Sequence, residues 1–225
     1  MSIKENLKDL KKSFFNSDCR LVAVSKTKTK AAIMEAYDAG IRDFGENKVQ
    51  EISEKAPDLP DDILWHMIGH LQRNKVKFIV PFIYLIQSVD SLRLLKQINK
   101  EGEKIKRTIP CLLQVYIAKE ETKYGWDEQE LYAFLFGDEI LDMHYIEIKG
   151  LMGMATNTSN QKTIRAEFRG LKFLFDKLKK ETLPDQVSME DLSMGMSGDY
   201  QIAQEEGSTM VRIGSAIFGE RDNNL

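Results

Sequence analysis

The sequence predicts an α/β protein built as a single (β/α)8 TIM barrel, with one additional helix before the first strand. Eight strand-like segments alternate with helix-like segments along the 225 residues. Most strands begin about 20 residues apart, which is close to the length of one strand plus one helix. Several strands are apolar on both faces, as expected when helices cover a parallel sheet. A doubly wound open sheet is the structural alternative, but no GxGxxG motif follows the first strand.

The additional helix is predicted from Ile3, Leu7, Leu10 and Phe14, which recur at spacings of three and four residues. The expected strands are 20–25, 43–47, 64–69, 83–89, 108–117, 145–153, 191–197 and 209–214. The clearest helices between them are 29–40, 91–102, 126–137, 163–181 and 201–207. We take Gly40 and Gly102 as the residues that end their helices. Residues 1–225 are expected to form one domain.

Composition and charge argue against several classes of function. The net charge is −3, from 32 basic and 35 acidic residues, and no basic stripe with interleaved aromatic residues supports nucleic-acid binding. The most apolar stretch, 78–86, is too short to cross a bilayer, and the first residues lack a signal peptide. Cys19 and Cys111 form no CxxC motif, so we expect a protein of the reducing cytoplasm. No long apolar helix face requires a dimer, and a monomer is expected.

The carboxyl ends of barrel strands form the active-site face of this fold. Here these ends carry lysine, glycine, histidine, methionine, serine and arginine. They are Lys26, Gly45-Glu46-Asn47, His66 with Gly69-His70, Met152-Gly153-Met154, Met194–Gly198 and Arg212–Ser215.

The last two strands predict an anion site. SMGMSGDY (193–200) and VRIGSAIFG (211–219) contain glycines, which let backbone N–H groups approach an anion, and the hydroxyl donors Ser197 and Ser215. Barrels often bind phosphate with these two loops. Either stretch alone is better explained as an ordinary Gly/Ser turn, so the prediction depends on their occurring together.

Lys26 and Arg212 add two cations to this face. Lys26 has the same strand parity as Val22 and Val24, so it would stand above an apolar barrel layer if that face points inward. Desolvation favours the neutral amine, which condenses with aldehydes. SKTKTK (25–30) taken alone favours three solvated lysines, so the reactive lysine depends on the rest of the site. Arg212 lies between Val211 and Ile213 and needs a partner, which is either a structural carboxylate or a ligand. An imine-forming lysine, a phosphate cradle and an arginine facing a ring nitrogen together describe pyridoxal phosphate.

Seven motifs, in order along the chain, resemble the pyridoxal phosphate homeostasis protein family. They are SKTK (25–28), FGENKVQE (44–51), WHMIGHLQRNK (65–75), KYG (123–125), GLMGM (150–154), LSMGMS (192–197) and GSTMVRIGSAIFGER (207–221). The family consists of single-domain barrels similar to the N-terminal domain of alanine racemase. The resemblance departs at Thr29, where the family commonly has proline, and is weaker over 134–149. A threonine at position 29 can cap the following helix.

The resemblance implies pyridoxal 5′-phosphate as cofactor, with Lys26 as the Schiff-base lysine. Ser197, Gly214 and Ser215 would then hold the phosphate, and Arg212 would face the pyridine nitrogen. Asn47 would lie near the cofactor, and His66 and Met196 are further candidates for the pocket. The implied role is to hold the cofactor and to buffer it or pass it to apo-forms of pyridoxal-phosphate enzymes, in vitamin B6 and amino-acid homeostasis.

Two rival functions stay open. An amino acid racemase of this architecture uses a second base, a tyrosine from an additional β-domain. The chain ends eleven residues after Gly214, so we expect no such domain and no catalysis. The other rival is a barrel that binds another phosphate ligand without an imine.

A metal site is not expected, because His66 and His70 are separated by a glycine in a strand-like segment and no third ligand is evident. We expect His66 to pack near the mouth or to support the pocket. Met152, Met154, Met194 and Met196 alternate at strand spacing and are expected to pack inside the barrel.

Overall fold

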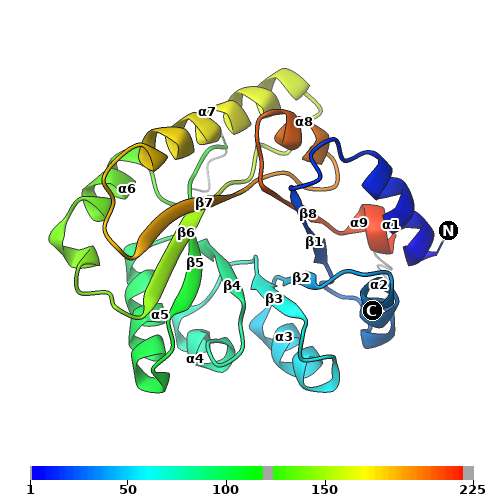
Figure 1. Cartoon of the computed structure of the whole chain (residues 1–225), viewed down its shortest axis with the longest axis horizontal. Coiled ribbons are helices and arrows are strands. Elements are labelled where there is room, and N and C mark those ends of the chain that lie inside the picture. Colours follow the sequence, from blue (N-terminus) through cyan, green and yellow to red (C-terminus); the bar gives the residue numbers. More distant parts are fainter. Residues whose placement is uncertain (1, 119–123, 220–225) are drawn as a thin grey trace.

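Eight parallel strands close into a barrel in the order β1 to β8, so the predicted fold is confirmed (Figure 1). The computed structural model describes residues 2–118 and 124–219. Lys123, Glu220 and Arg221, which belong to motifs named above, lie outside the described residues. The strands are β1 Arg20–Val24, β2 Asp43–Glu46, β3 Leu64–Met67, β4 Leu85–Val89, β5 Ile109–Gln114, β6 Ile146–Met152, β7 Val187–Ser193 and β8 Met210–Ile213.

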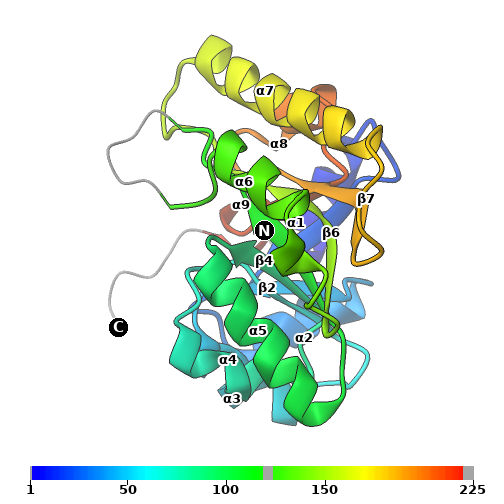
Figure 2. The same ribbon diagram turned by 90° about the vertical axis from the view of Figure 1, so that its left-hand side faces the viewer.

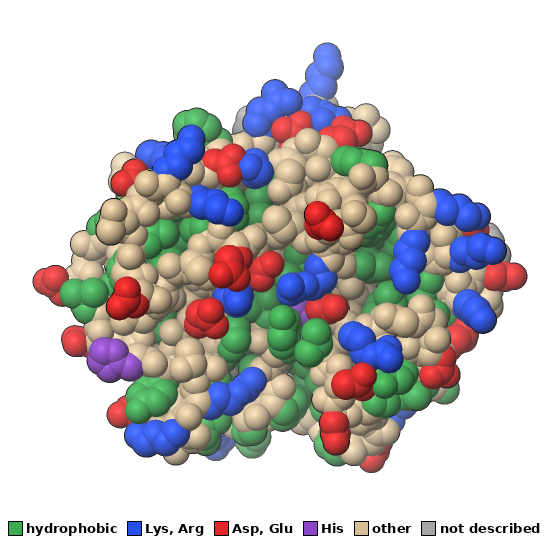
Figure 3. Space-filling model, in the orientation of Figure 1, with side chains coloured by type: hydrophobic (Ala, Val, Ile, Leu, Met, Phe, Trp, Pro, Cys, Tyr) green, Lys and Arg blue, Asp and Glu red, His purple; other side chains and the backbone are tan. Residues whose placement is uncertain are grey.

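Helices surround the strands on all sides (Figures 1 and 2). The α-helices are α1 Ile3–Lys12, α2 Lys30–Asp38, α3 Val49–Lys55, α4 Val76–Ile79, α5 Leu92–Ile105, α6 Glu128–Leu135, α7 Gln161–Lys179, α8 Tyr200–Glu205 and α9 Ser215–Phe218. Three 3-10 turns, η1 Ala56–Asp58, η2 Arg73–Lys75 and η3 Asp138–Ile140, complete the connections. No helix in the described parts of the chain is long and apolar enough to cross a membrane. On the face drawn in Figure 3, basic and acidic side chains are interspersed.

The predicted N-terminal helix is present as α1. Ser2 and Glu5 form a capping box at its start, which satisfies two backbone N–H groups. Leu7 and Leu10 are buried, and the amide of Asn6 donates a hydrogen bond to the carbonyl of Ile217 in α9 (2.9 Å). The first and last described helices therefore pack together.

Two separate apolar clusters form the core. The larger lies between the strands and the helices. The smaller fills the barrel interior and consists of Val22, Leu85, Leu112, Met152 and Met210. Val22 therefore points inward, which confirms the strand parity that would direct Lys26 to the barrel mouth.

Several boundaries differ from the prediction by a few residues, and two of the differences have a clear structural cause. The seventh strand is Val187–Ser193, not 191–197, because its first half is polar and Gly195 turns the chain with a φ of +99°. The second boundary is the end of α5, which continues past Gly102 to Ile105. Gly102 is needed for close packing, since a Cβ there would lie 2.7 Å from the carbonyl oxygen of Arg107. Lys106, in the left-handed conformation, follows the last residue of the helix.

The turn before α2 contains the helix cap that Thr29 predicted. The hydroxyl of Thr29 accepts a hydrogen bond from the N–H of Ala32 (3.2 Å), so the threonine caps α2. Thr27, two residues earlier, has a φ of 63°, which is unfavourable for a β-branched residue.

Candidate functional site

A cavity of about 320 Å³ opens at the carboxyl ends of β1, β2, β7 and β8. This size lies within the range of pockets that hold small molecules. Its described lining residues are Val24, Lys26, Lys28, Asn47, Ile68, Met154, Met196, Ser197, Gly198, Arg212, Gly214, Ser215 and Gly219. Every predicted site residue except His66 belongs to this set.

The charge of the cavity suits an anion. Lys26, Lys28 and Arg212 line it, whereas none of its described lining residues carries a carboxylate. The N–H of Gly214 donates to the hydroxyl of Ser197 (3.2 Å), which joins the loops that follow β7 and β8. Ser215 begins α9, and the first N–H groups of a helix have no partner within the helix. The two loops can therefore offer hydroxyl and backbone donors to one phosphate group.

Arg212 is held by neutral acceptors. The Nη1 atom of its guanidinium donates to Ser193 Oγ (2.6 Å), and its Nη2 atom donates to the carbonyl of Gly153 (3.0 Å). No residue in the described parts of the chain forms an ion pair with it. Burial lowers the pKa of Arg212 to about 10, so the guanidinium remains charged at neutral pH. A buried cation without a carboxylate partner favours the interpretation that it faces a ligand.

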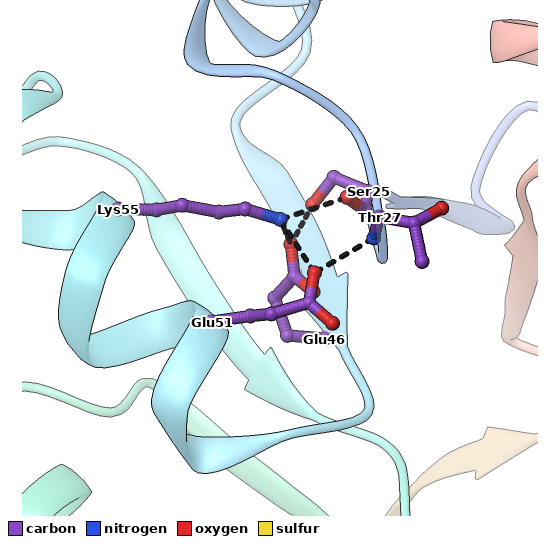
Figure 4. A network of polar contacts seen from close by, with 5 residues as sticks. All are labelled: Ser25, Thr27, Glu46, Glu51 and Lys55. Carbon is purple, nitrogen blue, oxygen red and sulfur yellow. Dashed lines mark hydrogen bonds and ion pairs between the residues drawn. The ribbon is translucent and has the colours of Figure 1, made fainter. Parts of the chain in front are cut away.

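The residues on both sides of Lys26 are fixed by a polar network (Figure 4). Ser25 Oγ donates to Glu46 Oε1 (2.7 Å), and Lys55 Nζ donates to the carbonyl of Ser25 (3.0 Å). Lys55 Nζ also bonds to Glu46 Oε1 and to Glu51 Oε2, both at 2.8 Å. Glu51 in turn accepts from the N–H of Thr27 (2.7 Å). We call Ser25, Thr27, Glu46, Glu51 and Lys55 the clamp.

The two carboxyl groups of the clamp have opposite pKa shifts. Burial raises the pKa of Glu46 to about 7, and hydrogen bonds from Lys55 and Ser25 offset only part of this effect. The pKa of Glu51 is also pushed upward by burial, but the hydrogen bonds from Lys55 and the Thr27 N–H outweigh it and lower the pKa. Glu51 therefore supplies the stable negative charge of the clamp at neutral pH.

His66 lies in the barrel interior and not near the mouth, which was one of the two places expected for it; support of the pocket, the other, stays a prediction. Its ring is fully buried and bonds to Asp43 Oδ1 (3.0 Å) and Gln87 Nε2 (2.9 Å), because Asp43 stands at the opposite, N-terminal end of β2. His70 is exposed and bonds to Asp90 Oδ2 (2.9 Å). In the described residues no group of three or more histidine, cysteine or acidic side chains could hold a metal ion.

The four methionines divide into two pairs. Met152 and Met194 are fully buried, but only Met152 lies in the cluster inside the barrel, as predicted, whereas Met194 packs in the cluster between the strands and the helices. Met154 and Met196 are 41% and 40% exposed and line the cavity, so their prediction as interior residues was wrong. Both follow the last residue of a strand, where strand alternation no longer determines the direction of the side chain.

Sequence reasoning missed Glu46, Glu51 and Lys55. A signal was present, because Glu51 and Lys55 are four residues apart on one helix and both glutamates lie within FGENKVQE. From that motif, only Asn47 was predicted to lie at the site. Ile68 and Lys28 also line the cavity without having been assigned a role.

A larger depression of about 630 Å³ lies beside the start of α5 and α6. Its described lining includes Asp90, Glu130 and Glu139 together with Trp126 and Phe134, but no lysine or arginine. It therefore lacks the cations that an anionic ligand needs.

Comparison with known proteins agrees with this geometry. The family model described as alanine racemase, N-terminal domain, matches residues 1–222. A pyridoxal phosphate homeostasis protein from Aquifex aeolicus is 38% identical over 203 residues, which cover 90% of this chain and 87% of the relative. The chain belongs to the pyridoxal phosphate homeostasis protein family. The human family member is 38% identical over 216 residues, covering 90% of this chain and 77% of that protein.

Solved structures place the family in the same fold. PipY from Synechococcus elongatus, solved with PLP bound, is 35% identical, has a TM-score of 0.86, and the match covers 97% of this chain and all of PipY. Alanine racemase from Bartonella henselae shares 17% identity with a TM-score of 0.73, over 98% of this chain and 60% of the racemase. The latter likeness shows the barrel fold alone.

Proposed function

We propose that this family member binds pyridoxal 5′-phosphate at the barrel mouth and acts as a carrier in vitamin B6 and amino-acid homeostasis. The observation that carries the proposal is the meeting of Lys26, Arg212 and the Ser197 and Gly214–Ser215 loops on one small cavity. PipY, a structural neighbour, holds PLP. The cofactor supplies an aldehyde, a ring nitrogen and a phosphate, and the cavity has a group suited to each.

Each residue has a distinct role in this proposal. The amine of Lys26 condenses with the aldehyde to form a reversible imine bond and releases one water molecule. Ser197, Gly214 and Ser215 hold the phosphate, with the two serine hydroxyl groups as donors. Arg212 faces the ring nitrogen as a donor and, because it is cationic, disfavours protonation of that nitrogen. Asn47 and Met196 lie against the remaining surface of the ligand.

A carrier fits the cavity better than a racemase does. Racemisation needs two bases on opposite faces of the substrate, and the known architecture uses a tyrosine as one of them. The described lining contains no tyrosine, histidine or carboxylate. An arginine at the ring nitrogen also makes the ring a weaker electron sink than a carboxylate would. We propose that the recipients are apo-forms of pyridoxal-phosphate enzymes, and that the protein works as a monomer in the cytoplasm.

Lys26→Ala tests the attachment site, with Lys28→Ala as the matched control because both lysines line the cavity. Visible spectra after addition of pyridoxal phosphate should show an imine band in the wild type and in Lys28→Ala. Borohydride reduction followed by peptide mapping should place the adduct on Lys26. No band in the wild type would reject the imine and leave a barrel for another phosphate ligand.

Incubation of the loaded protein with amino acids in deuterium oxide tests the racemase alternative. We expect no exchange of the α-proton above the rate of free pyridoxal phosphate. Faster exchange that disappears in Lys26→Ala would establish enzymatic chemistry and contradict the carrier proposal.

A further inference from the structure

A continuous line of buried hydrogen bonds runs through the barrel interior and ends at Arg212. Asp43 Oδ1 bonds to His66 Nε2 (3.0 Å), and His66 Nδ1 bonds to Gln87 Nε2 (2.9 Å). Gln87 Oε1 bonds to Ser193 Oγ (2.7 Å), which bonds to Arg212 Nη1 (2.6 Å). These residues come from β2, β3, β4, β7 and β8, so the line crosses the whole barrel. Only Arg212 lines the cavity.

Arg212 fixes the direction of every bond in this line. A guanidinium can only donate, so Ser193 Oγ accepts from Arg212 and its own hydrogen must go to Gln87. Gln87 therefore presents its carbonyl oxygen to Ser193 and its NH2 group to His66. His66 Nδ1 must then be an acceptor, and the proton of the neutral ring lies on Nε2, which donates to Asp43.

Two observations support this assignment. The second hydrogen of the Gln87 NH2 group points to the sulfur of Met210 (3.1 Å), a weak acceptor that could not serve a carbonyl oxygen. Burial lowers the pKa of His66, so the neutral ring that the line requires is favoured. The reversed arrangement would leave the Ser193 hydroxyl with two donors and no acceptor for its hydrogen.

We propose that Gln87 is a positioning residue. It holds Ser193, which in turn holds the Arg212 guanidinium at the cavity. His66, itself bonded to Asp43, fixes the orientation of the Gln87 amide. That Arg212 faces the ring of pyridoxal phosphate rests on the proposed function, whereas the directions of these hydrogen bonds do not. Gln87 makes no contact with the cavity, so its effect is confined to the part of a ligand that Arg212 meets.

Gln87→Met is the decisive variant, because methionine keeps the length of the side chain but offers Ser193 no strong acceptor. The probes are pyridoxal phosphate, pyridoxine 5′-phosphate, which has the ring and phosphate but no aldehyde, and inorganic phosphate. We expect affinity for both ring-bearing ligands to fall about tenfold, because the buried Ser193 hydroxyl loses its acceptor and no longer holds the guanidinium in one place. Affinity for inorganic phosphate should stay within about twofold, since the loops that would hold it are untouched.

Gln204→Met is the matched control, since Gln204 is also buried but its amide atoms have no hydrogen-bond partner among the described residues. It should leave all three affinities unchanged. Gln87→Glu is the rescue variant, because a carboxylate still accepts from Ser193. We expect its affinity for pyridoxine 5′-phosphate to stay within about threefold of the wild type.

Nitrogen-15 NMR of the histidine rings tests the line without any ligand. In the apo wild type, His66 should be neutral with its proton on Nε2, and in Gln87→Glu it should gain a proton on Nδ1. The opposite tautomer in the wild type would overturn the inference. The inference would also be overturned if Gln87→Met lowered the affinity for all three ligands equally, or if a folded Gln87→Met bound them as tightly as the wild type. A wild type that binds pyridoxine 5′-phosphate but forms no Lys26 adduct would reject only the proposed imine.

Discussion

The carboxyl group of Glu46 is fully buried, although its Oε2 atom has no hydrogen-bond partner among the described residues. Burial disfavours the charged form, which is why the pKa rises from its ordinary value of 4.5 to about 7. A group whose pKa is higher in the folded state stabilises the fold when it is protonated. This contribution is complete below pH 4.5 and is lost as the pH rises through about 7.

Glu46→Gln should remove this dependence. Relative to the variant, the free energy of unfolding of the wild type should fall by up to about 3 kcal/mol between pH 4.5 and about 7, measured by urea unfolding at several pH values. Glu51→Gln is the control, because the pKa of Glu51 is lowered and its own effect on stability therefore falls below pH 4.5, the ordinary pKa of a glutamate. Parallel curves for wild type and Glu46→Gln would show that Glu46 does not titrate in this range.

Single residues of the site were predictable where their chemistry is distinctive. A lysine at the end of an apolar strand, an arginine between two apolar residues and paired Gly/Ser loops pointed to Lys26, Arg212, Ser197 and Gly214–Ser215. The expectation that His66 packs near the mouth was wrong, because the position of a residue in a strand does not by itself give the depth of its side chain along the barrel. Its partner Gln87, and Ser193 to which Gln87 bonds in turn, are distant in sequence, and no local pattern joins them.

At the scale of elements, the bulge between β6 and β7 depends on one glycine. Gly150 has a φ of 148°, and the pairing between Ile148 and Gly150 shifts register against β7. A Cβ at this position would lie 1.9 Å from the carbonyl oxygen of Asp191. The strand could not accept a side chain here without moving its neighbour.

Gly150→Ala should lower the free energy of unfolding by about 3 kcal/mol or more, because both the backbone and the contact are strained. Gly170→Ala is a suitable contrast, since Gly170 lies inside α7 with open space around it. It should raise stability by about 0.5–1 kcal/mol, as alanine favours a helix interior. Urea unfolding measures the stability of both variants. A Gly150→Ala variant as stable as the wild type would show that this position does not require glycine.

Elements were predicted well where periodicity is strong and poorly where glycine or polar residues mask it. The eight strands and α1 followed from apolar patterns, whereas the polar first half of β7 hid its start. Gly102 suggested a helix end, but its role depends on the carbonyl of Arg107, a contact that helix periodicity does not show.

At the scale of the whole molecule, the cavity spans the seam where the barrel closes. β7 and β8 share only one register pair, Ser193 with Met210, while β8 pairs with β1 over four residues. The loops after β1, β7 and β8 all reach the cavity. A ligand that bridges them binds the closed barrel and has no equivalent site in the unfolded chain.

Pyridoxal phosphate at one hundred times its dissociation constant should therefore raise the free energy of unfolding by about 2.7 kcal/mol. Thermal unfolding measures this shift, and hydrogen exchange should show increased protection in β7 and β8. The ligand should give a smaller shift with Lys26→Ala at the same concentration. An unchanged melting temperature in the wild type would mean that the ligand does not distinguish the folded from the unfolded state.

The first and last parts of the chain are in contact, since α1 packs on α9 and β1 pairs with β8. This has a consequence for synthesis of the protein. During translation, Lys26 leaves the ribosome early, but Ser197, Arg212 and Ser215 follow only after most of the chain has been made. The nascent chain can fold its first βα units while lacking every proposed phosphate contact. If the proposed site is right, we expect cofactor loading to follow translation, since the phosphate contacts are complete only in the closed barrel.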